Sequence, residues 1–239
     1  MNEKTQFTVD PQGRWLYRVG GISAIVFAIA YVVIVAIFVP LGGMPTGGAE
    51  GWLKNMAEDS TSWTAIISLN ILTDFLLVPI ALARYLALKG VNKSVMLAAT
   101  VFVFFFPILD LPMTWGNIGS LFELSDQYAA AVNAAQTEAV VTAAMYPSAV
   151  MNSQFLGVFN SLAVNVGILL TGFVMLRGIF AKGTAYLGVA TGALGVMAVA
   201  FGLFESTSSL GFILIVLTAV LNAVWELSVG FRLCKLGWR

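Results

Sequence analysis

The sequence predicts an all-α membrane protein, a polytopic bundle of six transmembrane helices. Of its 239 residues, 59% are hydrophobic and only 10% are charged, whereas soluble domains carry about 25% charged residues. A soluble fold of this length could not bury so much apolar surface, so its surroundings must be lipid. The apolar residues also fall into runs of about 20, which is the length of a helix that crosses a bilayer. We therefore expect residues 1–239 to form one transmembrane helical-bundle domain.

Six runs are long and apolar enough to be membrane spans, and polar segments separate them. We place the spans at Val19–Val39, Trp63–Leu86, Val95–Trp115, Phe155–Leu176, Leu187–Phe204 and Phe212–Phe231. The first run follows basic residues, as a signal peptide would, but it has about 19 apolar residues and no small-residue cleavage site after it. We therefore expect it to be retained as the first span.

The basic residues are distributed unevenly between the two sides of these spans. Such residues favour cytoplasmic loops, and with the N-terminus inside, the outer segments hold only Lys54 of the 12 basic residues. The inner segments hold Lys4, Arg14, Arg18, Arg84, Lys89, Lys93, Arg177, Lys182, Arg232, Lys235 and Arg239. The sequence thus predicts a multi-pass protein of the cell (plasma) membrane with both termini in the cytoplasm.

The two longer outer loops each predict a helix outside the bundle. In the first loop, Trp52, Leu53 and Met56 share one side of a short amphipathic stretch, which is typical of a helix on the membrane surface. In the second loop, Ser125 can cap an alanine-rich helix that ends before Pro147. We expect this extra amphipathic helix to lie passively on the outer surface; a lid over the bundle is the alternative.

The fifth span is rich in glycine. Gly188 and Gly192 match the small-xxx-small pattern that lets two helix backbones approach closely. We expect this face to pack against a neighbouring span of the same chain, and contact between copies in a homo-oligomer is the alternative.

Three acidic residues, Asp74, Asp110 and Glu226, lie within predicted spans. Placing a carboxylate in hydrocarbon costs at least ~2.5–3.5 kcal/mol, and such residues usually face a bundle interior or a wet cavity. We count Arg84 with an inner segment, so no basic residue is expected within a span to neutralise the acids. Glu226 is near enough to the inner face to be hydrated or to pair with Arg232. Three unpaired carboxylates cannot all stay ionised, so they must be protonated, hydrated or bound to a cation.

Neutral polar side chains accompany the acids. Asn70 precedes Asp74 by four positions and Asn222 precedes Glu226 by four, so each pair shares a helix face. Asp110 lies between two prolines, which should kink or unwind the helix as in the broken helices of transporters. We predict a ligand- or ion-binding site made by Asp74, Asp110, Asn70, Asn165, Asn222, Glu226 and Trp115. The alternative is that these groups only join helices, at ~0.6 kcal/mol per hydrogen bond.

Three segments of the chain carry a resemblance to a known family. The second span ends in ARYLALKG, the outer helix reads LFELSDQYAAAVNAAQTEAV, and the fourth span leads into GFVMLRGIFAKGTAYLGVATGALGV. In this order they resemble a prokaryotic family of six-helix membrane proteins catalogued only as a domain of unknown function. The resemblance covers most of the chain and implies a six-helix bundle. The resemblance implies no activity and no catalytic residues, because none is known for the family.

Two classes of function fit these observations best. The first is binding or transport of a proton, a cation or a small amphipathic solute through the acidic and amide cluster. The second is a non-catalytic membrane scaffold or accessory subunit.

An intramembrane enzyme is the remote alternative. Two aspartates invite comparison with aspartyl membrane proteases, but their flanks, LTDFL and ILDLP, lack the glycine-rich motif expected there. The chain has no histidine, which argues against a metal site, a cofactor and a histidine-activated nucleophile. Its net charge of zero gives no reason to expect nucleic acid. The partners we expect are the lipid bilayer, the bound solute and further copies of the chain.

Overall fold

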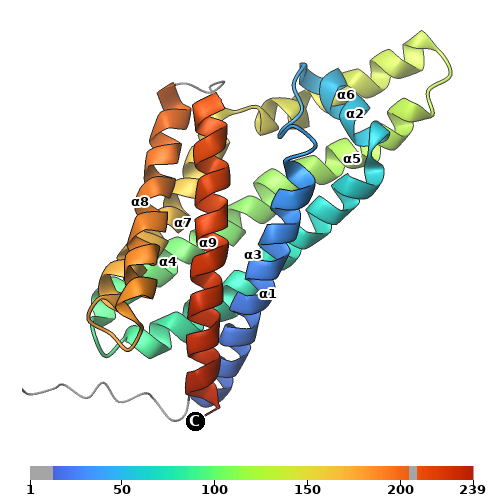
Figure 1. The fold of residues 1–239 in the computed structure, drawn as a ribbon. Helices are drawn as coiled ribbons and strands as arrows, with labels where there is room; N and C mark the ends of the chain where they lie inside the picture. Colours follow the sequence, from blue (N-terminus) through green and yellow to red (C-terminus); the bar gives the residue numbers. More distant parts are fainter. Residues whose placement is uncertain (1–12, 205–208, 239) are drawn as a thin grey trace, which may run out of the picture.

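The structure, a computed structural model, describes residues 13–204 and 209–238, so Lys4 and Arg239 of the predicted inner segments lie outside it. Within these ranges the chain is helical and has no strand. Figure 1 shows the α-helices, and a single π-helical turn (η2) lies between α4 and α5. Their bounds are α1 Arg14–Phe38, α2 Gly48–Glu58, α3 Ser60–Leu88, α4 Lys93–Asp110, η2 Leu111–Trp115, α5 Gly116–Ala129, α6 Ala134–Met151, α7 Gln154–Met175, α8 Lys182–Phe204 and α9 Ser209–Gly237.

Five of the described helical segments are long and apolar enough to cross a membrane. They are Arg14–Phe38, Ser60–Leu88, Lys93–Ala129, Lys182–Leu203 and Ile213–Gly237. A shorter apolar segment, Ser161–Met175, belongs to α7. An all-helical chain with several helices of membrane-spanning length is thus confirmed for the described residues, and a sixth span at α7 stays a prediction.

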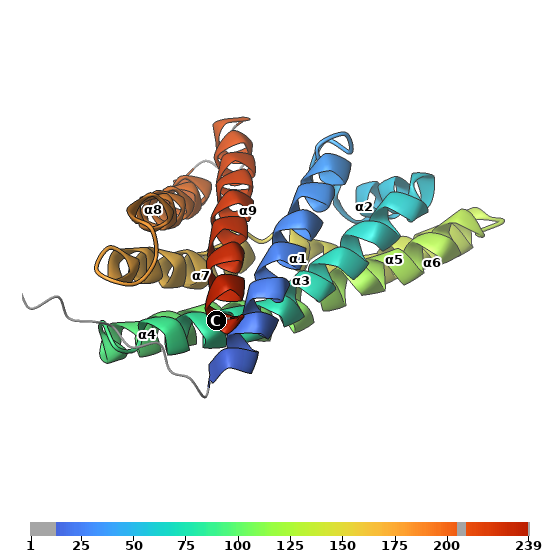
Figure 2. The ribbon, with the colours of Figure 1, turned by 60° about the horizontal axis from the view of Figure 1, so that its bottom comes forward.

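Glycines set the distance between α1 and the two helices beside it. A Cβ on Gly20 would lie 2.7 Å from the carbonyl oxygen of Pro79 in α3, and one on Gly21 would lie 2.7 Å from the backbone nitrogen of Cys234 in α9. Any larger residue would push the helices apart, because real Cβ atoms do not approach other atoms this closely. Helix α1 therefore lies directly against both α3 and α9, as Figures 1 and 2 show.

The glycine face of α8 packs within the chain. A Cβ on Gly192 would lie 2.5 Å from the backbone nitrogen of Leu169 in α7, and one on Gly188 would lie 2.6 Å from Nε1 of Trp225 in α9. This is the intramolecular packing that the small-xxx-small pattern predicts.

The two ends of the described chain lie side by side. Nε of Arg18 in α1 donates a hydrogen bond to the carbonyl oxygen of Gly237 in α9 at 2.7 Å, and the Arg18 guanidinium lies 4.6 Å from the ring centroid of Trp238. Figure 1 shows the α3–α4 and α7–α8 turns at this same end of the molecule. Most of the basic residues are therefore gathered at one end of the bundle.

A second hydrophobic core lies at the opposite end. We call α2, α5, α6 and the first two turns of α3 the outer unit. Its fully buried side chains include Trp52, Leu53 and Met56 of α2, Trp63 of α3 and Leu121 of α5. The prediction that α2 lies on the membrane surface through Trp52, Leu53 and Met56 is therefore wrong, because α5 and α6 cover that side of the helix.

The boundaries predicted for the outer helix, from Ser125 to the residue before Pro147, are also wrong. Ser125 lies inside α5, where its hydroxyl donates to the carbonyl oxygen of Phe122, because α5 continues the helix that begins in α4. The side chain of Asn133 instead caps the next helix by accepting from the amide of Gln136. Pro147 does not follow this helix but is buried inside it. Two packed helices therefore stand where one surface helix was expected.

Candidate functional site

The structure brings two of the predicted acids together. Asp74 is the middle residue of α3 and Asp110 is the last residue of α4. A hydrogen bond joins their side chains, and they are only 2% and 7% exposed. A carboxyl group can donate a hydrogen bond only when it is protonated, so this arrangement requires a proton shared between the two groups. We call Asp74 and Asp110 the aspartate pair.

The π-helical turn η2 supplies two donors to Asp110. The Thr114 hydroxyl donates to Oδ1 of Asp110 at 2.5 Å, and Nε1 of Trp115 donates to Oδ2 at 2.7 Å. The turn is wider than an α-helical one, since the amide of Gly116 donates to the carbonyl oxygen of Leu111, five residues before it. The expected disruption between the two prolines is thus a local π turn, while α4, η2 and α5 continue along one line (Figure 2). Single π turns inside α-helices occur frequently at functional sites.

The second carboxyl oxygen of Asp74, Oδ2, is buried and makes no hydrogen bond within the described residues. A buried acceptor without a donor costs about 1–3 kcal/mol. The Asp74 side chain therefore has unused capacity for a proton, a water molecule or a cation.

Tyr31 of α1 links the aspartate pair to a cavity. It lies close enough to Asp74 and Asp110 for an electrostatic interaction with both, and its ring stacks on Phe27 with the centroids 5.1 Å apart. A half-open cavity of about 150 Å³ lies beside Tyr31 between α1 and α9, and its lining exposes only apolar atoms. The lining residues are Tyr31, Val32, Val35, Ala219, Val220 and Ala223.

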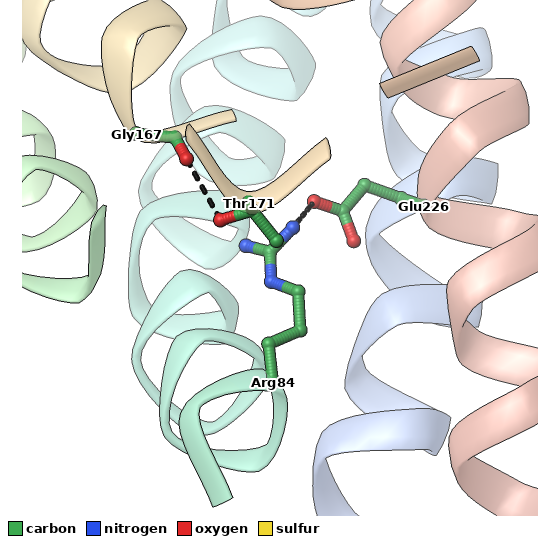
Figure 3. Close-up of polar contacts among 4 residues, drawn as sticks. All are labelled: Arg84, Gly167, Thr171 and Glu226. Carbon is green, nitrogen blue, oxygen red and sulfur yellow. Dashed lines mark hydrogen bonds and ion pairs between the residues drawn. The ribbon is translucent and has the colours of Figure 1, made fainter. Parts of the chain in front are cut away.

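Glu226 belongs to a different polar centre. Its Oε1 accepts a hydrogen bond from Nη1 of Arg84 at 2.8 Å, and the two side chains are 1% and 2% exposed (Figure 3). The expectation that no basic residue lies beside the acids is therefore wrong for Glu226. Arg84 lies one turn before the end of α3, and its side chain points into the bundle. We call Arg84 and Glu226 the inner ion pair.

Of the two alternatives for Glu226, hydration or pairing with Arg232, the structure does not show the pairing. Nε of Arg232 donates to the carbonyl oxygen of Ile179, after the end of α7, at 3.1 Å. Arg84 instead stacks over the ring of Trp225, with its Cζ 4.8 Å from the centroid. A guanidinium is stabilised both by a carboxylate and by an aromatic face, so Arg84 is held by two adjacent residues of α9.

Several polar atoms of this inner centre have no partner. Nη2 of Arg84, Oε2 of Glu226 and Nε1 of Trp225 are buried and make no hydrogen bond within the described residues. Figure 3 shows Thr171 of α7 beside Arg84, with its hydroxyl donating to the carbonyl oxygen of Gly167. The ion pair is thus enclosed by α3, α7 and α9.

The three predicted amides do not join the aspartate pair through any recorded hydrogen bond. Nδ2 of Asn70 donates to the carbonyl oxygen of Ile66, and Nδ2 of Asn165 donates to that of Ser161, each within its own helix. The Oδ1 atom of Asn222 is buried and has no hydrogen-bond partner among the residues that the structure describes. Of the seven predicted residues, Asp74, Asp110 and Trp115 thus form one site and Glu226 lies in another, while none of these hydrogen bonds of the described residues joins the three amides to either site.

Two residues that matter here were not predicted. Tyr31 is one of only two polar side chains in the predicted first span. A polar side chain in an otherwise apolar span could have indicated that it lies beside other polar groups. Arg84 falls within the apolar run Trp63–Leu86 and was nevertheless counted as a loop residue. A basic residue inside a span is a reason to look for an acidic partner on another helix.

The geometry limits the chemistry that each centre can perform. Two carboxyls that share a proton can bind and release protons or accept a cation, and in aspartic proteases such a pair activates a water molecule. The last role needs a polar substrate beside the pair, whereas the cavity next to Tyr31 is lined by apolar atoms. The charge-neutral Arg84–Glu226 pair joins α3 to α9, and losing either partner would leave an uncompensated buried charge.

Comparisons with known proteins do not narrow the range of functions that the two centres allow. No family model, no curated protein and no solved structure matches the chain. The resemblance to the six-helix family of unknown function therefore stays a prediction from the sequence.

Proposed function

We propose that this chain is a plasma-membrane protein that binds a proton at the aspartate pair and uses that site to bind or transport a small cation or cationic amphipathic solute. We further propose that the chain has six spans, with α7 as the fourth, and that both termini lie in the cytoplasm, because the side of the bundle where both ends of the described chain lie also carries most of the basic residues. The observation that carries the proposal is the hydrogen bond between Asp74 and Asp110 in the interior of the bundle.

Two further contacts support this assignment. Thr114 and Trp115 both donate to Asp110, which stabilises a negative charge on that residue. Within the described part of the chain, Oδ2 of Asp74 has no hydrogen-bond partner, so Asp74 is the member of the pair with capacity for an incoming proton or cation.

Proton binding is tested by infrared difference spectroscopy on the purified full chain in lipid nanodiscs. Between acid and alkaline pH we expect a band from a buried protonated carboxyl group, which disappears in Asp74→Asn. Asp126 is an exposed acid of α5, so Asp126→Asn is the matched control and keeps the band. If Asp74→Asn and Asp110→Asn both leave the spectrum unchanged, the aspartate pair does not bind the proton and the proposal fails.

Transport is tested separately in liposomes that contain a pH-sensitive dye. We expect protein-dependent proton movement driven by a cation gradient, abolished by Asp74→Asn and retained by Asp126→Asn. Proton binding without such movement would restrict the function to binding.

A scaffold or accessory subunit is the second candidate, and the outer unit is the observation that favours it. The α5–α6 hairpin projects beyond the bundle (Figure 1), and Val132 at its turn is 85% exposed. A stoichiometric partner that co-purifies with the chain and is lost on Val132→Glu would support this function.

A further inference from the structure

The cavity beside Tyr31 suggests which solute the aspartate pair serves. We propose that the space between α1 and α9 binds the apolar part of a hydrophobic monovalent cation, one aromatic ring in size, whose charged group is directed towards the aspartate pair. This inference rests on the proposed function and specifies the class of its ligand.

The size and lining of the cavity define the apolar part of the ligand. Its volume is about 150 Å³ and its lining exposes no polar atom. A space of about 150 Å³ is large enough for a molecule the size of benzene. Val32 and Val220, which line it, are exposed on the surface of the bundle, so a ligand can enter directly from the hydrocarbon of the membrane.

The charge of the ligand follows from the groups around Tyr31. Tyr31 lines the cavity and also interacts electrostatically with Asp74 and Asp110. Aromatic rings and carboxylates both attract cations. The nearest described basic residue on α3 towards the inner end is Arg84, ten positions or about 15 Å beyond Asp74, and it is already paired with Glu226. A cation near Tyr31 therefore meets acidic groups that no bound arginine neutralises.

Unpartnered acceptors on the adjacent helices add to this preference. Oδ2 of Asp74, Oγ1 of Thr218 and Oδ1 of Asn222 are all buried without a hydrogen bond in the described residues. Thr218 and Asn222 are four residues apart on α9, where they immediately precede the lining residues Ala219 and Ala223. The partial negative charge on these oxygen atoms attracts a cation, and the Asp74 carboxyl group would repel an anion.

The exchange of charge balances for a monovalent cation. When the aspartate pair carries two protons, binding of one cation releases one proton to water. The other proton stays shared between the two carboxyls, and the site remains neutral.

The test uses benzyltrimethylammonium as the probe and the full chain in weakly buffered lipid nanodiscs with a pH indicator. We expect saturable proton release. Tetramethylammonium, which has the charge but no ring, and benzyl alcohol, which has the ring but no charge, should each bind at least roughly tenfold more weakly, because each loses one of the two interactions.

Two variants fill the cavity from opposite sides without changing an acid. Ala219→Leu on α9 and Val35→Leu on α1 should each weaken binding by roughly tenfold or more, since extra methylene groups occupy the space for the ring. Ala190→Leu is the matched control, because Ala190 is an exposed alanine of α8, and it should bind like the unmodified chain.

The outcomes separate this inference from the function on which it rests. If the protonated-carboxyl band is present but benzyltrimethylammonium releases no proton, or if both cavity-filling variants bind it normally, the cavity is not the ligand site and this inference is overturned. If the band itself is absent, the proposed proton site fails. Proton release that both variants weaken and Ala190→Leu preserves would support the inference.

Discussion

The aspartate pair and the inner ion pair show how one sequence pattern leads to two different sites. An asparagine precedes the acid by four positions in both α3 (Asn70 and Asp74) and α9 (Asn222 and Glu226). Glu226 meets an arginine from another helix, whereas Asp74 meets a second aspartate. The inner ion pair is electrically neutral without any bound proton. The aspartate pair requires a shared proton, because two buried carboxylates would repel each other. The partner on the neighbouring helix, and not the local pattern, therefore determines what a buried acid does.

The largest expected effect comes from breaking the inner ion pair. Arg84→Leu leaves the buried Glu226 carboxylate without its cation, which should lower the free energy of unfolding by about 3–5 kcal/mol. The double variant Arg84→Leu with Glu226→Leu should recover most of this loss, because no buried charge remains. Denaturant unfolding in detergent micelles measures both variants.

The matched control for this change is Arg177→Leu, at an exposed position after α7. It should change stability little, since an exposed charge contributes at most about 1 kcal/mol. A double variant that is no more stable than Arg84→Leu would show that packing, rather than the buried charge, sets the cost.

A smaller effect is expected at Asp110. Asp110→Ala leaves the Trp115 indole and the Thr114 hydroxyl without their acceptor, which should cost about 1–3 kcal/mol. Trp115 fluorescence should shift on the same substitution as its surroundings change. Asp126→Ala, on the exposed surface of α5, should alter neither quantity, and an unchanged stability of Asp110→Ala would mean that η2 does not depend on these bonds.

The smallest expected effect comes from replacing an acid by its amide, a change that can be made in each of the two sites and compared. In Asp74→Asn the amide can donate to Asp110 as the shared proton does, so stability should change by less than about 1 kcal/mol. Glu226→Gln replaces a hydrogen bond between charged groups and should cost more, about 1.5–3 kcal/mol. Parallel unfolding curves test this order, and a larger loss for Asp74→Asn would contradict the shared proton.

Much of the bundle could be predicted from composition and periodicity alone. Apolar runs of about 20 residues predict long helices with little dependence on tertiary contacts, and the glycines of α8 predict close packing. The position of Asp110 between two prolines likewise predicts a disturbed helix, although a π turn rather than a break resolves it.

The outer unit and the partners of the acids could not be predicted in this way. Trp52 is fully buried only because α5 and α6 return to cover it, and a pattern within α2 looks the same whether lipid or protein covers it. Asp74 and Asp110 belong to different helices, so their hydrogen bond depends on how α3 and α4 cross. Arg84 was misplaced for a simpler reason, because a charge near the end of a span was assumed to face water.

The π turn at η2 has a consequence for insertions and deletions in this chain. A single π turn accommodates one residue more than the α-helix around it. Deleting Met113, which is 45% exposed, would convert the segment to regular α-helix and leave α5 facing the same way. The outer unit would keep its fit, and Trp115 would follow Asp110 by four positions instead of five, so its indole would still lie on the same helix face as the carboxyl group. The extra residue is therefore not what directs α5 or the indole.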